Sequence, residues 1–414
     1  MVRKNREILI AKLAFFMLVG SFGAFLNFIN LYLEQVVGLT GSQIGFITFA
    51  GLIATVIMNP VWGYLADKTG KHVFFLKLTF LSAAIMGAIY SGSRSFMMII
   101  IVSIIFEGMR APIMPLLDYI STNFSEKYRY DYGKIRVFAS LGFLLVAMAT
   151  GFMVAGAEFE WFGRSIGFAG FLSIEFATFG IFIVMNAVAS LLLFFLPKQE
   201  GEIENVKTST KKAFGKQEIQ ALLSNRPFLF ILILTMLGFM TLESVFSYFS
   251  MHLVTTLGAS ESIVSWIAFF MVTPELIVLP LGTVLITKFG FKNWYVLSFI
   301  TMLIRLVIYS FTTIPLIFAA AGVLHTIMVV MHFTGTISYI RKVVPTSVLG
   351  LSFTVLASAM ALSRGVLSFL FGWLYENINS FAVFQVAILL VLIGLIMTLK
   401  SKYLKEIGDE IEVI

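Results

Sequence analysis

Twelve apolar segments, each long enough to cross a lipid bilayer, constrain this chain more than any other feature of its sequence. A transmembrane helix needs about 20 consecutive, mostly apolar residues. Because lipid offers no hydrogen-bond partners, such segments satisfy their backbone only as helices or as closed barrels. The sequence predicts helices near residues 8–33, 43–66, 73–91, 96–120, 135–155, 176–196, 227–253, 262–286, 293–312, 316–340, 347–374 and 381–400. We therefore expect an all-α integral membrane protein with twelve transmembrane helices.

Composition supports this expectation and argues against other classes of protein. Of the 414 residues, 59% are hydrophobic and 12% are charged, whereas soluble domains carry about 25% charged residues. Cysteine is absent, so no disulfide or thiolate metal site is expected. The net charge of +7 comes from basic residues between the apolar segments and not from a dense patch. We therefore expect no nucleic-acid partner.

The longest polar stretch divides the chain into two halves. It covers 197–226 and carries six basic residues. A basic loop between two sets of six helices is typical of transporters built from repeated halves. We predict an N-terminal six-helix bundle at 1–196, a cytoplasmic central loop at 197–226 and a C-terminal six-helix bundle at 227–414. Residues 156–175 are expected to form an outer loop with a short amphipathic helix.

The placement of basic residues predicts the orientation in the membrane. With both termini in the cytoplasm, 22 of the 29 Lys and Arg residues fall in inner segments, and two, Arg94 and Arg164, fall in outer loops. Cytoplasmic loops carry an excess of Lys and Arg. We expect a multi-pass protein of the cell membrane, with its first apolar segment retained as a helix and not cleaved as a signal peptide.

The run GYLADKTGKH at 63–72 joins the second and third predicted helices. Its aspartate closes a helix, where a charge can meet the helix terminus or a basic group, and its second glycine permits a tight turn. The run resembles the signature loop of the major facilitator superfamily, a conformational latch in that family. The resemblance implies latch roles for Gly63, Asp67, Lys68, Gly70 and Lys71. A plain basic hairpin loop is the alternative.

An internal repeat supports the two halves. The Lys-x-Gly core of the latch run recurs at Lys288 and Gly290, between the eighth and ninth predicted helices, although the aspartate is missing there. Two halves related by an axis along the membrane normal produce parallel repeats of this kind.

Several ionisable residues fall inside the predicted helices. A charge at the bilayer centre costs about 3 kcal/mol on insertion scales, so these side chains should pair or face a cavity. Glu107 and Arg110 lie three residues apart on one helix face and can neutralise each other, either for structure alone or for function. The candidates are Glu107, Arg110, Asp118, Arg136, Glu243, Glu275, Arg305, His325, His332 and Arg364.

A closer resemblance rests on the run from Pro115 to Asp118, followed by the run from Tyr132 to Phe143. These stretches resemble the lactose permease group of sugar–proton symporters. That group has a carboxylate 18 residues before an arginine, and an aromatic residue seven positions later that stacks on the sugar. The resemblance implies a solute site that contains Asp118, Arg136 and Phe143.

The first helix adds Asn27 and Asn30 to the candidate solute site. The segment from Phe22 to Asn30 and the run Asn59-Pro60-Val-Trp62-Gly63 also resemble the lactose permease group. Asparagines inside a membrane helix either line the cavity or bond neighbouring helices, and both alternatives stay open here.

The second half continues the resemblance. Glu243 and Glu275 are 32 residues apart, Arg305 precedes His325 by 20, and Arg364 lies about one turn from the family lysine that pairs with the acid at Glu243. The resemblance implies that Glu275 binds solute and links it to proton movement. The implied charge network comprises Glu243, Glu275, Arg305, His325 and Arg364.

One position departs from the family. Where lactose permease has a proton-releasing glutamate, three residues after the histidine, this chain has Met328. Either another carboxylate carries the proton, with Glu275 and Glu243 as candidates, or coupling differs. Burial in an apolar cavity favours the protonated form of a carboxyl, which is compatible with Glu275.

Taken together, these patterns predict a secondary active transporter that moves a sugar, nucleoside or similar small polar solute by proton-coupled symport. The alternative is an efflux antiporter of drugs or amphipathic compounds. The resemblance to the major facilitator superfamily disfavours it, because antiporters of that superfamily usually carry a Gly-Pro-rich motif on the fifth helix, and 143–151 contains no proline. No Walker-type loop, HExxH or GxSxG motif occurs, so we expect no enzyme activity, metal or cofactor. The expected partners are the solute, protons and the lipid bilayer, and the protein is expected to be a monomer.

Overall fold

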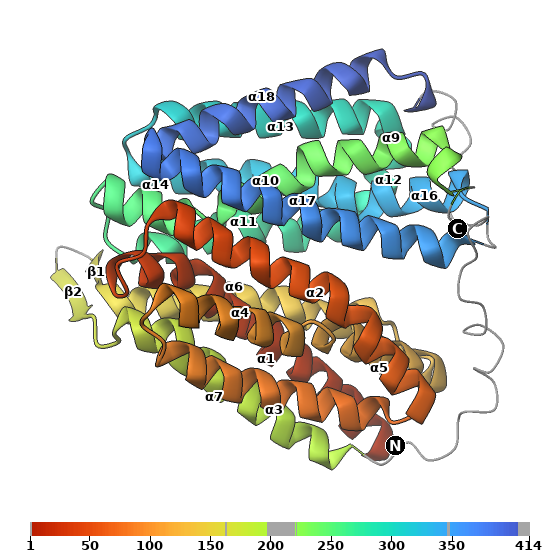
Figure 1. Ribbon diagram of the computed structural model, residues 1–414, viewed down its shortest axis with the longest axis horizontal. Coiled ribbons are helices and arrows are strands. Elements are labelled where there is room, and N and C mark those ends of the chain that lie inside the picture. The colour runs from red at the N-terminus through yellow and green to blue at the C-terminus, as the bar shows by residue number, and fades with distance from the viewer. Residues whose placement is uncertain (1, 162–163, 197–219, 221, 346–347, 405–414) are drawn as a thin grey trace. The chain divides into compact units, whose positions relative to one another are not determined.

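The computed structural model describes residues 2–161, 164–196, 220, 222–345 and 348–404 (Figure 1). Within these residues, twelve helical spans are long and apolar enough to cross a membrane. The predicted all-α membrane fold with twelve spans is confirmed. The spans are Lys4–Gln35, Gly41–Thr69, His72–Ser91, Phe96–Tyr128, Gly133–Ala155, Phe176–Phe195, Arg226–Phe246, Ile263–Phe289, Phe291–Phe311, Pro315–Val343, Leu349–Asn377 and Ser380–Lys400.

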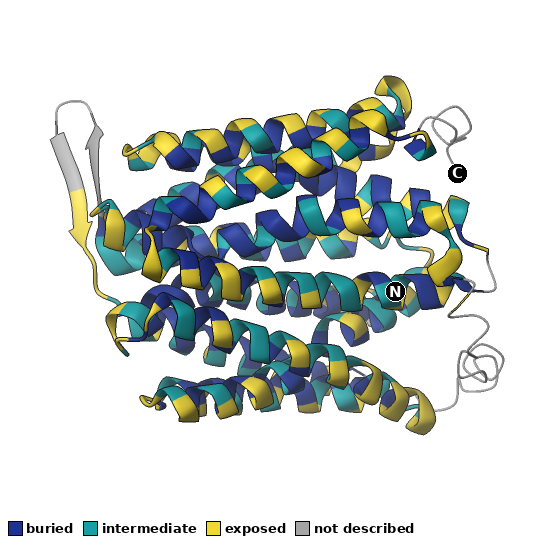
Figure 2. Cartoon of the chain, turned by 45° about the horizontal axis from the view of Figure 1, so that its top comes forward, coloured by how far each residue is buried: buried dark blue, intermediate teal, exposed yellow. Residues whose placement is uncertain are grey.

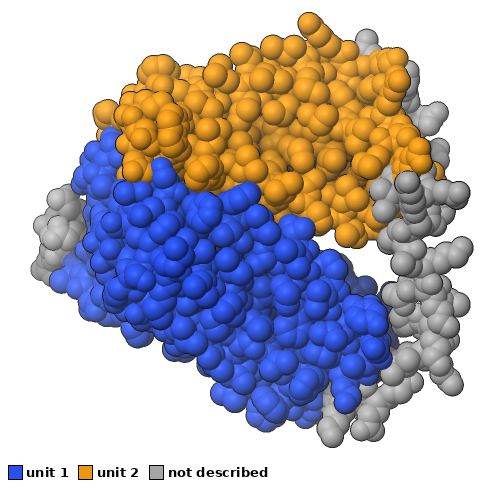
Figure 3. Space-filling view, in the orientation of Figure 1, with its two compact units in different colours: residues 1–204, 247–269 blue, residues 205–246, 270–414 orange. Residues whose placement is uncertain are grey.

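The chain forms two compact units, which Figure 3 shows in two colours. Unit 1 consists of Met1–Glu204 and Ser247–Phe269, and unit 2 consists of Asn205–Phe246 and Phe270–Ile414. The predicted division into bundles at 1–196 and 227–414 stays a prediction, and most of its central loop lies outside the described residues.

Unit 1 is built around the first helix, which packs against α5, α6 and α7, while α2 and α3 both pack against α4. Glycines allow α1 and α6 to approach closely: a Cβ on Gly142 would lie 2.4 Å from the carbonyl oxygen of Phe16. The elements are α1 (Val2–Gln35), α2 (Gly41–Thr69), α3 (His72–Ser91), α4 (Phe96–Arg110), α5 (Ile113–Tyr128), α6 (Gly133–Ala155), β1 (Gly156–Trp161), β2 (Arg164–Ala169), η1 (Phe176–Gly180), α7 (Ile181–Leu192), η2 (Leu193–Phe195) and η5 (Met251–Thr256). The helix α11 (Ile263–Val278) belongs to this unit as far as Phe269.

Unit 2 places α13 against α18 and α15, and α10 against α17 and α18. Tyr309, Phe318 and Phe384 form an aromatic cluster in its core, with ring centroids 3.7–5.6 Å apart. The elements are α9 (Arg226–Thr235), η4 (Met236–Met240), α10 (Thr241–Phe246), η6 (Leu279–Leu281), α12 (Gly282–Phe289), α13 (Phe291–Phe311), α14 (Pro315–Ala320), η7 (Ala321–Leu324), α15 (His325–Val330), η8 (Met331–Thr336), α16 (Ile337–Val343), α17 (Leu349–Asn377) and α18 (Ser380–Lys400).

Buried and exposed residues alternate around the helices (Figure 2). Large apolar side chains occupy exposed positions, among them Ile57, Ile85 and Leu389. An exposed apolar surface of this extent is a membrane interaction surface and not that of a soluble monomer. These exposed apolar positions are suited to contact with lipid.

Polar residues and glycines set the helix ends. Thr40 and Gln43 form a capping box at the start of α2, in which each side chain bonds the backbone of the other residue. Gly70 ends α2 with a φ of 64°, and its N–H donates to the Asp67 carbonyl. The tight turn predicted at Gly70 is confirmed. Its repeat counterpart, Gly290, also has a positive φ of 82°.

The expectation of an amphipathic helix within 156–175 is wrong. The structure has an antiparallel hairpin here, in which β1 pairs with β2 from Gly156 opposite Ala169 to Trp161 opposite Arg164. The physical reason is the period of the sequence. Phe159 and Trp161 alternate with Glu158 and Glu160 in the first strand, and Ile166 and Phe168 are two apart in the second. This period of two favours a strand over a helix.

Several spans are not regular helices. The fourth span breaks between α4 and α5, at Ala111 and Pro112. Four π-helical segments, η1, η4, η5 and η8, interrupt the helices of the described residues. A π turn contains one residue more than an α turn, and such turns are frequent at functional sites.

Candidate functional site

Asp118 on α5 and Arg136 on α6 meet across the turn that joins these helices. Nε of Arg136 lies 3.7 Å from Oδ1 of Asp118, and the Tyr132 hydroxyl donates to the same oxygen at 2.6 Å. The arginine and aspartate side chains are 37% and 38% exposed. The predicted partners are therefore brought together as a partly exposed ion pair.

Tyr132 is a member of this cluster that charge patterns did not identify. Its burial and its hydrogen bond to Asp118 raise the pKa of the phenol above the ordinary tyrosine value. The hydroxyl therefore remains a donor at neutral pH. On its other side, the Arg136 guanidinium lies over the Phe15 ring of α1, with 5.1 Å between them. Phe143 is half-buried on α6, about 10 Å along the helix from Arg136.

Asn27 and Asn30 lie buried on α1. The Asn27 amide donates to the Gly23 carbonyl of its own helix at 2.6 Å, and the Asn30 amide donates to the Ser247 carbonyl at 2.6 Å. A membrane asparagine can either line the cavity or bond a neighbouring helix, and Asn30 bonds a neighbouring segment. Solute binding by either residue stays a prediction.

Glu107 and Arg110 form the ion pair that their spacing predicts, with each side chain 18% exposed. The pair lies at the C-terminal end of α4, next to the break in the fourth span.

The turn between α2 and α3 holds a contact that the sequence motif alone does not reveal. Nε2 of His72 lies 2.9 Å from Oδ1 of Asp67. The His72 ring stacks on Tyr119 of α5, with centroids 4.3 Å apart. The Lys68 ammonium lies 5.5 Å from the Tyr64 ring centroid. Asp67 thus meets a basic side chain next to the turn, and that side chain in turn contacts the fourth span.

In unit 2, Glu243 and Arg364 form the pair expected from the resemblance. Nη1 of Arg364 lies 3.9 Å from Oε2 of Glu243, and the side chains are 24% and 29% exposed. The Ser244 hydroxyl donates to the Arg364 carbonyl at 3.4 Å. The pair links α10 to α17, although it is only partly buried.

Arg305 is one of the most deeply buried charged residues in the described part of the chain, with 1% exposure. Its Nε donates to the Tyr309 hydroxyl at 2.6 Å, and its Nη1 lies 3.2 Å from Nδ1 of His325. Since a guanidinium only donates, Nδ1 accepts, and the histidine ring carries its hydrogen on Nε2. Nη2 points to the Met271 sulfur at 3.5 Å.

Glu275 lies half-buried on α11, directly after Pro274. Met328, which replaces the family glutamate, is buried next to Gly238: a Cβ on Gly238 would lie 3.0 Å from the methionine methyl group. A second buried histidine on the same span, His332, stacks on Phe239 at 3.9 Å with nearly parallel rings.

The candidate residues therefore occur in both units. Unit 1 holds Asn27, Asn30, Asp118, Arg136 and Phe143, and unit 2 holds Glu243, Glu275, Arg305, His325 and Arg364. Among the described residues, no group of three or more His, Cys, Asp or Glu side chains is arranged to hold a metal ion.

Comparison with known proteins identifies relatives along almost the whole chain. The model of the MFS_1 like family matches residues 8–386. The uncharacterized transporter YwbF of Bacillus subtilis (strain 168) is 26% identical, over 91% of this chain and 89% of its own. A maltose permease of Geobacillus stearothermophilus is 26% identical, over 96% and 95%. A probable 3-phenylpropionic acid transporter of Escherichia coli (strain K12) is 22% identical, over 89% and 91%.

Solved structures share the fold. The nucleoside transporter NupG superposes with a TM-score of 0.75, at 15% identity, over 97% of this chain and 100% of its own. A D-xylose-proton symporter superposes with a TM-score of 0.69, at 17% identity, over 95% and 97%. At these identities the likeness concerns the fold.

Proposed function

Because the chain belongs to the MFS_1-like family of major facilitator superfamily transporters, we propose that it imports a small polar solute, a sugar or nucleoside, together with protons. Transport would proceed by alternating access, in which the two halves rock around a central site. The observation that carries this proposal is the set of ion pairs inside apolar spans, Asp118–Arg136 and Glu243–Arg364.

Asp118, Arg136 and Tyr132 have the chemistry to bind hydroxyl groups. A carboxylate accepts from a hydroxyl, while the guanidinium donates in a planar fork. In the proposed site, these side chains and Glu275 hold solute hydroxyls, Phe143 supplies a stacking face, and Asn27 and Asn30 complete the polar lining.

The proposed coupling network lies in unit 2. Glu243 and Arg364 pair with each other, and Arg305 holds His325 in one tautomer. Charges in lipid-spanning segments are costly and are retained where they serve ion or proton movement. A proton that reaches Glu275 or Glu243 changes the charge balance of this network, which would couple the proton to solute movement.

The proposed latch comprises Gly63, Asp67, Lys68, Gly70 and Lys71. The contact between Asp67 and His72 and the stacking of His72 on Tyr119 connect this turn to the fourth span. The excess of basic residues in alternate loops supports a cell-membrane location with both termini in the cytoplasm. We also propose a monomer.

The test is a thermal-shift measurement on purified protein with maltose, uridine and 3-phenylpropionate. A specific ligand stabilises by about 2.7 kcal/mol at about 100 times its Kd. We expect maltose or uridine to raise the unfolding temperature. We also expect that solute to accumulate in proteoliposomes under an inward proton gradient.

Two results would contradict the proposal. If only 3-phenylpropionate raises the unfolding temperature, the solute is an aromatic acid, as the name of one relative suggests for that relative, and not a sugar or nucleoside. Outward transport of an amphipathic dye against the proton gradient would favour the efflux alternative. In the expected case, accumulation collapses when a protonophore dissipates the gradient.

A further inference from the structure

The ion pair of Glu107 and Arg110 lies near the middle of a transmembrane span. The fourth span runs from Phe96 to Tyr128, and it breaks directly after Arg110. Asp118 lies eight residues further along, about 12 Å toward the end of the span. Sites for solutes and coupling ions in secondary transporters lie near the midplane, at interrupted helices. The pair therefore lies closer to such a position than Asp118 does.

Two other helices of unit 1, α1 and α2, lie against this pair. The Arg110 guanidinium lies over the Phe22 ring of α1, 4.7 Å from its centroid. Gly51 of α2 leaves room for Glu107, since a Cβ there would lie 2.8 Å from Cγ of the glutamate. Both side chains of the pair therefore lie against other helices of unit 1, and each is 18% exposed.

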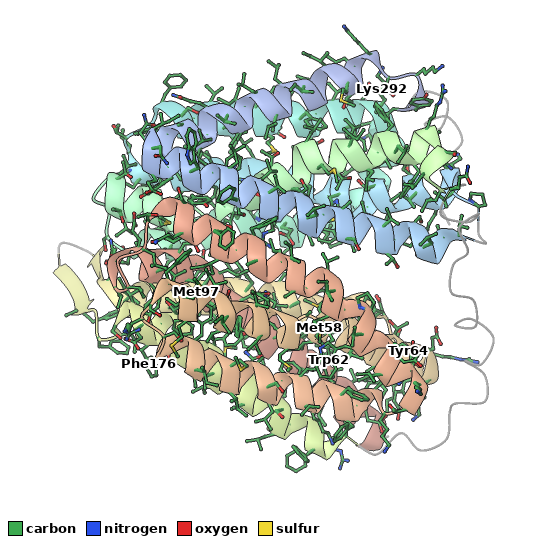
Figure 4. All side chains as sticks on the ribbon, viewed as in Figure 1. Met58, Trp62, Tyr64, Met97, Phe176 and Lys292 are labelled. Atoms are coloured by element: carbon green, nitrogen blue, oxygen red, sulfur yellow. The ribbon has the colours of Figure 1, made fainter. Side chains whose placement is uncertain are left out.

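Side chains of α2 hold the backbone next to the pair in place. The Trp62 indole donates to the Gly108 carbonyl at 3.0 Å, and Met58 fills the space in front of Gly108. Figure 4 labels Met58 and Trp62, which both lie on α2. A site held in this way on two packed helices keeps its geometry better than one on a loop. This contact therefore fixes the backbone of α4 between Glu107 and Arg110.

The two charges of the pair depend on each other. With Glu107 ionised, the pair is neutral, and with Glu107 protonated, the Arg110 charge has lost its carboxylate. Nε of Arg110 is buried and makes no hydrogen bond with the described residues. Tyr90 on α3 is a further titratable group within electrostatic reach of Glu107. A purely structural role explains the pair poorly, because apolar residues of similar volume often stabilise as well or better.

We propose that Glu107 is a proton-binding site of unit 1 and that Arg110 is its counter-charge. A proton from the outer aqueous side adds to a carboxylate oxygen of Glu107, and the ion pair opens. The same proton later leaves to the cytoplasmic side, and the pair closes again. No other bond forms or breaks. The inference rests on the proposed function in one respect, the coupling of transport to protons.

The first test compares two transport measurements on the variant E107Q in proteoliposomes. Maltose, uridine and 3-phenylpropionate serve as separate probes. We expect E107Q to retain exchange of the transported probe at equal pH on both sides, because Glu107 does not hold solute. We expect its accumulation under a proton gradient to vanish. The matched control is E126Q, which changes an exposed carboxylate on the same span and should accumulate like the wild type.

Accumulation by E107Q equal to that of the wild type would overturn the proposal. If E107Q fails to fold, the double variant E107Q/R110M replaces it, because it leaves no lone charge in the span. The conservative variant E107D keeps the pair and should shift the pH dependence of accumulation. An unchanged pH dependence in E107D contradicts the proposal as well.

A measurement without solute separates this inference from the proposed function. Infrared difference spectra between acidic and alkaline pH should contain a band of a protonated carboxyl that E107Q lacks and E126Q retains. An identical band in E107Q would overturn the inference whatever the transport result. Conversely, wild-type protein that shows no proton-driven uptake of any probe contradicts the proposed function, while the band still decides whether Glu107 binds a proton.

Discussion

A charged residue inside an apolar helix is stabilised by its individual polar contacts. Arg305 is the extreme case, because its guanidinium contacts a phenol, an imidazole and a thioether. Polar groups buried without a hydrogen-bond partner cost free energy, so each such contact has a stabilising role in addition to any role in transport. Substitutions at this scale must therefore separate stability from function.

At Glu275, the substitution to Gln should abolish proton-driven accumulation, since the amide cannot carry a proton between the two sides. Uptake down a concentration gradient is measured in parallel. The matched control is E261Q, which changes a carboxylate just before the same helix. Glu275 is not the coupling group if E275Q still concentrates solute.

For Tyr132, the substitution to Phe removes the donor to Asp118. We expect a loss of about 0.5–1.5 kcal/mol in stability, the net value of one hydrogen bond. The raised pKa of the phenol adds a pH dependence. The folded state holds the phenolic proton more tightly than the unfolded state, so this stability is present below the ordinary tyrosine pKa and is lost as pH rises toward the raised value.

Thermal unfolding in detergent across alkaline pH tests this prediction. The wild type should lose more stability than Y132F as the pH increases above the ordinary tyrosine value. The control is Y64F, because Tyr64 is 62% exposed. Equal pH profiles for wild type and Y132F would contradict the assigned hydrogen bond.

At the scale of elements, small residues set how closely helices approach. A Cβ on Gly142 of α6 would lie 2.4 Å from a backbone oxygen of α1. Because the neighbour is backbone and not a flexible side chain, G142A must push α1 and α6 apart. We expect a loss of about 1–3 kcal/mol, the range for overpacked sites, visible as a lower unfolding temperature.

The matched control is G350A, since a Cβ at Gly350 would meet nothing within 4 Å. This variant should unfold at the wild-type temperature. Equal unfolding temperatures for G142A and G350A would contradict the close approach of α1 and α6.

Irregular elements were the part of the fold that sequence patterns did not predict. The hairpin of β1 and β2 was mistaken for a helix, because the period-two pattern within it is short. The π segments, such as η4 and η8, depend on packing against neighbouring helices, and no local propensity signals them. The break after Arg110 coincides with Pro112, which offers a local signal.

At the scale of the molecule, the twelve spans were predictable because lipid forces long apolar helices. Of the candidate contacts, Asp118–Arg136 followed from charge and position, Glu243–Arg364 followed from the resemblance to lactose permease, and both pairs occur. The sequence did not predict that Tyr132 bonds Asp118, that His72 contacts Asp67, or that Tyr309 bonds Arg305. These partners are set by how the helices pack, and the position of a residue in the chain does not reveal them.

Orientation is also a property of the whole chain, and its lack of cysteine makes it testable. A single cysteine at Ser260, on an exposed turn, should react in intact cells with a membrane-impermeant maleimide. A single cysteine at Lys134, exposed at the start of α6, should react only after permeabilisation. The opposite pattern would place both termini outside the cell.

The π-helical segment η8 lies in the part of the tenth span that packs against α13. Tyr295 bonds Thr336, and Arg305 bonds His325. The two residues on α13 are ten apart, whereas their partners on the tenth span are eleven apart. A regular helix rotates by about 100° per residue, so removal of one residue between His325 and Thr336 would turn one of these partners by about 100° away from α13. The π-helical segment Met331–Thr336 lies in this stretch. Shortening this stretch by one residue would leave the span helical and apolar, yet its two polar anchors could no longer reach α13 at once.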